Sequence, residues 1–180
     1  MRPDLEDVPG SALASLGTGV LATVGMDVAM VATSRLAPRA FAADEIGLEV
    51  IGRWAAGLLR GELRHDVATL KPIAGEVALG VAVHYLTGTV LTAGYLEGMR
   101  LAGRTPQVAS AAAYGRAMSA LPLLVMYPAM ALGCCGRRSK DRRQLVSLMM
   151  CGHLAFGLGI GVCGRLLQRR RAHPVTTPKG

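Results

Sequence analysis

The sequence predicts an all-α, polytopic membrane protein with four transmembrane helices and an amphipathic interfacial helix between the first and second. Of its 180 residues, 51% are hydrophobic, only 4% are aromatic and 23 are glycine. Small residues suit membrane helix interfaces, where close backbone approach replaces the hydrophobic effect as the packing force. Four long runs carry few or no charges, whereas a soluble bundle needs a polar face on every helix. These runs match the roughly 20 residues that a bilayer-spanning helix needs.

The formal net charge of +8 narrows the choice of partner. In a soluble chain such a charge favours nucleic acid binding. Here the basic residues flank the apolar runs, as expected for loops near anionic lipid, and aromatic residues for base stacking are scarce. We therefore expect the lipid bilayer as the partner, with anionic lipid at the basic loops, and no nucleic acid.

The first run follows an acidic, proline-containing segment, residues 1–9, that is expected to be a mobile tail. The run spans about residues 10–34, and Asp27 is its only charged residue. Gly19, Thr23 and Asp27 recur at four-residue spacing, so they share one helix face. Asp27 is a candidate ligand or proton-binding group, or it bonds to a neighbouring helix.

Residues 35–76 form the longest polar section of the chain. Within it, apolar residues recur at three- and four-residue steps, which predicts an amphipathic interfacial helix over residues 44–60. Arg53 and Arg64 are expected to reach lipid head groups, and Trp54 is placed to anchor the helix at the interface.

Three further spans are predicted at about residues 77–96, 106–136 and 144–164. The second carries Gly80, His84 and Gly88 on one face, and the third contains two prolines that should kink it. In the fourth, His153 stands at the head of a small-residue groove that continues through Gly157 and Gly161. Residues 10–166 thus form one membrane domain, and residues 167–180 a basic, disordered tail.

The polar groups inside the spans are predicted to share one depth. Counted from the side that bears the 35–76 segment, Asp27 and His84 lie roughly 10 Å inside and His153 roughly 13 Å, at about 1.5 Å per residue. Met126 and Tyr127 reach a similar depth. This agreement suggests one polar pocket, which opens toward the face that bears Arg64, His65, Asp66 and Glu76.

Three uses of this pocket remain open. Asp27, His84 and His153 can bind a divalent metal, because neutral imidazole and carboxylate are suitable ligands. The same trio can relay protons, since imidazole titrates near neutral pH. The third use is structural, with the histidines hydrogen-bonded between helices. No other cofactor is indicated.

An ordered set of short motifs resembles the DUF2938 family of bacterial membrane proteins of unknown function. The motifs are Gly19 to Asp27, Gly52-Arg53-Trp54, Gly61 to Asp66, Gly75-Glu76, His84-Tyr85, Pro122, Met126, Pro128-Ala129, Ser147, His153 and Phe156 to Gly159. The resemblance covers about residues 17–163 and implies four membrane helices without implying an activity. Val81, Tyr127 and the longer charged tail depart from the family's pattern.

We expect a non-enzymatic module of the bacterial inner membrane whose polar pocket binds or passes a small ligand, a proton or a metal ion. The candidate ligand-binding residues are Arg53, Trp54, Arg64, His65, Asp66, Glu76 and Tyr85. A first alternative is a small membrane enzyme that uses His65, Asp66 and Glu76 as acid–base groups. A second alternative is an assembly subunit whose glycine-rich faces pack against a second copy or a larger membrane complex.

Overall fold

The computed structural model describes residues 8–36, 43–66 and 69–172, and these residues form helices and turns without any strand. This arrangement confirms the all-α prediction. The helices are α1 (Val8–Leu36), α2 (Ala43–Ile46), α3 (Leu48–Leu59), α4 (Glu76–Leu101), α5 (Val108–Met118), the π-helical turn η2 (Pro122–Met126), α6 (Tyr127–Ala129), the 3-10 turn η3 (Cys134–Gly136) and α7 (Arg142–Ala172).

Four helical segments are long and apolar enough to cross a membrane, as predicted. They are Ala12–Leu36, Glu76–Leu101, Val108–Ala129 and Arg142–Leu167. Large apolar side chains on their outer surfaces are exposed, for example Leu21 at 61%, Leu86 at 64% and Val125 at 61%. Apolar surface repeated along every span suits contact with lipid rather than with water.

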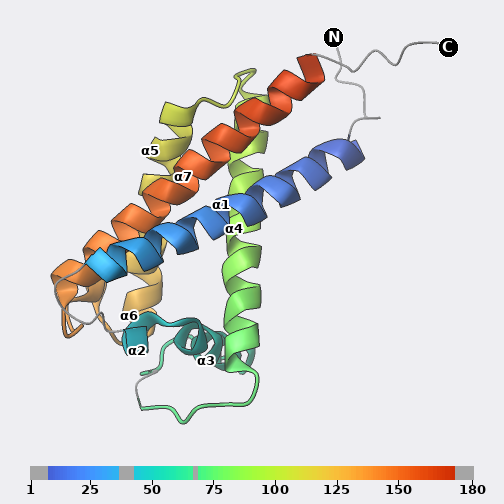
Figure 1. Ribbon diagram of the computed structural model, residues 1–180. Helices are drawn as coiled ribbons and strands as arrows, with labels where there is room; N and C mark the ends of the chain where they lie inside the picture. Colours follow the sequence, from blue (N-terminus) through green and yellow to red (C-terminus); the bar gives the residue numbers. More distant parts are fainter. Residues whose placement is uncertain (1–7, 37–42, 67–68, 173–180) are drawn as a thin grey trace.

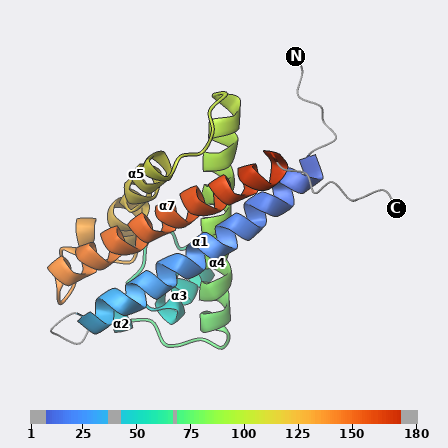
Figure 2. The ribbon, with the colours of Figure 1, turned by 45° about the horizontal axis from the view of Figure 1, so that its top comes forward.

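The spans pack around α7, which lies between α1 and α5, while α1 also packs against α4. In Figures 1 and 2, α1 and α7 run side by side in opposite directions, and α4 crosses them at a steep angle. At the bottom of Figure 1, α3 lies beside the first turns of α4, and the short α2 lies below α6. The α4–α5 connection is on the opposite side of the spans from α2 and α3 (Figure 1).

Small residues set the contact between α5 and α7. A Cβ added at Gly161 would lie 2.6 Å from the Cα atom of Val108, and one at Gly157 would lie 2.9 Å from the Cα atom of Ala112. Real Cβ atoms are almost never that close to a neighbour. The predicted groove at His153, Gly157 and Gly161 is therefore the surface on which α5 packs.

The third span ends earlier than predicted, and it contains a π-helical turn in the region where its prolines were predicted to kink it. It stops at Ala129 rather than near residue 136, because the chain turns through positive φ angles at Ala131, Gly133 and Cys135 (64°, 76° and 51°) that no right-handed helix contains. Pro122 begins a π-helical turn, in which the Tyr127 N–H donates to the Pro122 carbonyl. Proline has no N–H to donate, and a local π-helical adjustment is one way in which a membrane helix accommodates this loss.

Other boundaries also differ from the prediction. The interfacial segment predicted at 44–60 is divided into α2 and α3 by the extended backbone of Gly47. The last helix continues to Ala172, so residues 167–172 are helical and not part of a disordered tail. The first helix begins at Val8, inside the predicted 1–9 tail. Residues 1–7 and 173–180, on which the two tail predictions otherwise fall, lie outside the described residues.

Candidate functional site

Asp27 of α1 and two successive residues of α4 form a polar cluster between the first two spans. The Nε2 atom of His84 lies 2.9 Å from Oδ1 of Asp27, and the Tyr85 hydroxyl donates to Oδ2 at 2.9 Å. Because a carboxylate can only accept, Nε2 of His84 carries the proton in this contact, and Nδ1 is left for another partner. Each carboxylate oxygen therefore has a donor, which reduces the cost of a charge at this depth.

Small residues bring Asp27 and His84 to the same level. Along α1, Gly19 and Thr23 precede Asp27 at four-residue steps, and along α4, Gly88 follows His84 by four residues. A Cβ at Gly19 would lie 2.7 Å from the Cα atom of Thr89, and one at Gly88 would collide with the Thr23 hydroxyl. The two helices are thus close enough for the short Asp27 side chain to reach α4, and the predicted shared face of α1 is the face that contacts α4.

His153 belongs to α7 and bonds within its own helix. Its Nδ1 atom lies 2.9 Å from the carbonyl oxygen of Met149, one turn earlier. A carbonyl can only accept, so Nδ1 donates and Nε2 is left as an acceptor. No hydrogen bond joins His153 to Asp27 or His84 within the part of the chain that the structure describes.

The two histidines line one cavity of about 280 Å³ that all four spans surround. No lining side chain carries a formal charge, and four of the nine methionines of the chain contribute to the wall. The lining residues are Met26, Met30, Ile46, Ile51, Trp54, Val83, His84, Thr87, Gly88, Leu91, Leu121, Pro122, Val125, Met126, Tyr127, Met149, His153 and Phe156. Five groups were predicted to share one depth. Four of them line this cavity, and the fifth, Asp27, contacts it only through His84.

The predicted metal ligands come together only in part. Across residues 8–36, 43–66 and 69–172, no group of three His, Cys, Asp or Glu side chains is arranged to hold a metal ion. Asp27 and His84 bond to each other, whereas Nδ1 of His153 is occupied by the Met149 carbonyl. The sequence could place the three residues at one depth, but it could not show which way each side chain turns.

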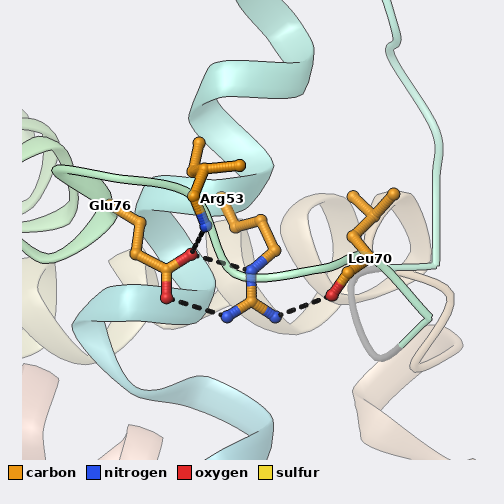
Figure 3. A network of polar contacts seen from close by, with 4 residues as sticks. Arg53, Leu70 and Glu76 are labelled. Atoms are coloured by element: carbon orange, nitrogen blue, oxygen red, sulfur yellow. Dashed lines mark hydrogen bonds and ion pairs between the residues drawn. The ribbon is translucent and has the colours of Figure 1, made fainter.

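Arg53 and Glu76 form a bidentate ion pair where α3 crosses the start of α4 (Figure 3). Nε and Nη2 of Arg53 each donate to one carboxylate oxygen at 2.9 Å, and the backbone N–H of Ile73 adds a third bond at 2.9 Å. Nη1 of Arg53 reaches the Leu70 carbonyl at 3.4 Å. The hydrogen bond to Glu76 is the main cause that raises the pKa of the Arg53 guanidinium, so this pair stays charged.

This ion pair corrects the expectation that Arg53 reaches lipid head groups. Both side chains are only 12% exposed and bind each other. The crossing is tight because Gly52 and Gly80 lie at it: a Cβ on Gly52 would collide with the Glu76 carbonyl, and one on Gly80 with the Leu48 carbonyl. Arg53 and Glu76 therefore fix α3 to α4, and their role in ligand binding stays a prediction.

Trp54 turns toward the protein interior instead of anchoring α3 at the interface. It packs beside the buried pair Val50 and Met130 and lines the cavity. Its indole Nε1 atom is buried without a hydrogen-bond partner, and so is the hydroxyl of Tyr127. The cavity wall thus includes two residues whose polar hydrogens have no acceptor among the described residues.

The remaining predicted residues, Arg64, His65 and Asp66, lie in the turn after α3. The His65 imidazole packs over Gly57, where it blocks any larger side chain, and its backbone N–H donates to the Ala129 carbonyl. The Asp66 carbonyl accepts from Thr69, and Arg64 is exposed beside the end of the third span. These residues connect the turn to neighbouring elements and are not among the lining residues of the cavity, so an opening of the cavity toward them stays a prediction.

Some contributors to the site carry no sequence signal. Thr87, Met149 and Phe156 line the cavity, yet each is an ordinary apolar or small residue in a long apolar run.

Outside the cavity, the Glu45 carboxylate accepts from the Ser139 hydroxyl and from the Lys140 N–H, which ties α2 to the segment before α7. A glutamate in a polar section gives no hint of a partner more than ninety residues away.

Residues 16–167 match the family described as "Protein of unknown function (DUF2938)". The match covers the last three spans, α2 and α3 completely and the first span from residue 16 onward. No curated protein and no solved structure matches the chain.

Proposed function

The chain belongs to the DUF2938 family, and we propose that it is an integral module of the bacterial inner membrane whose intramembrane cavity binds a small ligand. The observation that carries the proposal is the cavity of about 280 Å³ into which the four spans bring two imidazoles. Ligand sites are typically apolar cavities of roughly 300–1,000 Å³ with a few polar groups. An intramembrane ionisable group with a defined partner, such as Asp27 with His84, is also a common mark of function.

A small ligand fits the site better than a metal ion does. The wall is uncharged, and the Asp27 carboxylate is already occupied by two donors. A divalent cation needs several anionic or neutral donors around it. The free nitrogen of His84 and that of His153 instead offer two hydrogen-bonding positions to an uncharged molecule.

The acid–base alternative loses support from the positions of two of its three groups, Glu76 and His65. Glu76 is bound by Arg53 and the Ile73 N–H, and the His65 Nε2 atom is buried without a partner under α3. A general acid or base must be within hydrogen-bond reach of a substrate, and these two are directed into structural contacts. The subunit alternative is weakened as well, because the glycines at 19, 52, 80, 88, 157 and 161 are used in contacts within the chain.

Trp54 supplies a direct test because it is the only tryptophan of the chain and lines the cavity. We would titrate the protein in lipid nanodiscs with 2-bromophenol, whose bromine quenches indole fluorescence at short range. The probe dissolved in the bilayer quenches Trp54 in linear proportion to its concentration. The proposal predicts an additional component of quenching that saturates as the probe fills the cavity.

Two matched variants of α4 control the experiment. Val83→Phe fills the cavity and should remove the saturable part, whereas Val81→Phe, on a residue that is 38% exposed and outside the cavity wall, should keep it. Purely linear quenching of the parent protein would refute the proposal.

A further inference from the structure

Helices α2 and α3 bound the cavity on the polar side, which bears the 35–76 segment, and the exposed lining residues of the cavity belong to the membrane spans. On the polar side it is covered by Ile46 of α2, which is 8% exposed, and by Ile51 and Trp54 of α3. The exposed lining residues are Thr87 of α4 together with Leu121 and Val125 of the third span. All three lie within membrane-spanning segments, so the opening faces hydrocarbon.

The size of the cavity limits how much of a ligand it can hold. At about 280 Å³ it is at or below the lower end of the range for small-molecule sites, roughly 300–1,000 Å³. It can therefore hold one ring with a substituent but not a whole lipid. A longer molecule would have to leave its chain in the bilayer, and a lateral opening allows this.

The chemistry of the wall favours an aromatic ring with a hydroxyl group. Met26, Met30, Met126 and Met149 surround the space, and thioethers adapt their shape and make favourable contacts with aromatic rings. Because Nδ1 of His153 donates to the Met149 carbonyl, its Nε2 atom is left as an acceptor. A hydroxyl can donate its single proton to this nitrogen or to Nδ1 of His84, which is also an acceptor when Nε2 carries the proton of that ring.

We infer that the cavity binds the head of a phenol or quinol that carries a long apolar chain, and that this molecule enters from the bilayer between α4 and the third span. The inference rests on the proposed function and specifies its ligand class. It requires no covalent step, because the hydroxyl group only exchanges hydrogen-bond partners on entry.

The test compares three probes on the parent protein in nanodiscs, with quenching of Trp54 as the readout. The first is 2-bromophenol, the second is 2-bromo-4-dodecylphenol, and the third is the methyl ether of the second, which cannot donate a hydrogen bond. We expect saturable quenching by the long-chain phenol and, at equal mole fraction in the bilayer, binding about tenfold weaker for its ether, as the loss of one hydrogen bond predicts.

A pair of variants tests the route of entry. Thr87→Phe narrows the opening and should abolish saturable quenching by the long-chain phenol, whereas Leu86→Phe, on an adjacent residue that is 64% exposed and outside the wall, should not. Circular dichroism checks that both variants keep their helices.

The outcomes separate this inference from the function on which it rests. Saturable quenching by 2-bromophenol but not by the long-chain phenol would overturn the inference and leave the proposed function standing. Equal binding of the ether, or full binding to Thr87→Phe, would also overturn it. Linear quenching by every probe would remove both proposals.

Discussion

Replacing Gly19 by alanine tests whether close contact between α1 and α4 holds Asp27 opposite His84. An added Cβ at Gly19 would lie 2.7 Å from the Cα atom of Thr89, a backbone atom that cannot rotate away. Ordinary contact begins at 3.4 Å, so the two helices would have to separate locally by about 0.7 Å, an overpacking that costs about 1–3 kcal/mol.

The same substitution at Gly25 supplies the control within the same helix. Nothing lies within 4 Å of a Cβ at Gly25, so Gly25→Ala should gain only the helix preference of alanine, about 0.5–1 kcal/mol. Gly19→Ala has that gain as well, which leaves a net loss of about 0–2.5 kcal/mol after the overpacking.

The difference between the two variants is measured by reversible unfolding in mixed micelles. Helical circular dichroism is followed while the fraction of dodecyl sulfate rises, and the free energies of unfolding are compared. Gly19→Ala should be less stable than Gly25→Ala by about 1–3 kcal/mol. Equal stability would mean that α1 and α4 are not in backbone contact at Gly19, and the geometry that places Asp27 beside His84 would be refuted.

Three further predictions follow from hydrogen bonds outside and inside the spans. Glu76→Gln should lower the midpoint of the same dodecyl sulfate titration, because it weakens the Arg53–Glu76 pair that fixes α3 to α4. Glu62→Gln, which removes the charge of an exposed pair with Arg60, should change the midpoint little. Equal effects of the two substitutions would contradict the structural role of the Arg53–Glu76 pair. Tyr114→Phe removes a 2.9 Å bond to the Leu91 carbonyl and should reduce the free energy of unfolding by about 0.5–1.5 kcal/mol; unchanged stability would show that the bond does not form. Nitrogen NMR of labelled histidine should find the proton of His153 on Nδ1 and that of His84 on Nε2, and the opposite tautomers would exclude the contacts described here.

The architecture could be predicted from the sequence because the bilayer restricts what an apolar chain can do. A run such as residues 77–96 has no charge to place in water and can satisfy its backbone only as a helix. Four-residue spacing then identified the packing faces: Gly19, Thr23 and Asp27 against α4, and His153, Gly157 and Gly161 against α5. Depth counting also placed His84 and His153 at the cavity.

Side-chain partners could not be predicted in the same way. Arg53 and Trp54 have the chemistry of interfacial residues, yet a tight glycine crossing turns one toward Glu76 and the other toward the cavity. Spacing within one helix says nothing about how a second helix crosses it. The end of the third span was misplaced for a related reason, because the positive φ angles after Met130 include non-glycine residues that the sequence does not mark as turn formers.

The polar contacts of α4 decide which side of the lateral opening can adjust its position. This helix is held at two levels, by Arg53 at Glu76 and, two turns further on, by Asp27 at His84 and Tyr85. Sliding or rotating it would break both. The opposite rim is η2, whose proline, leucine, valine and methionine side chains offer no hydrogen-bonding group of comparable strength. The α4 side of the opening is therefore held in place, and any motion that opens or closes it has to come from the π-helical turn η2.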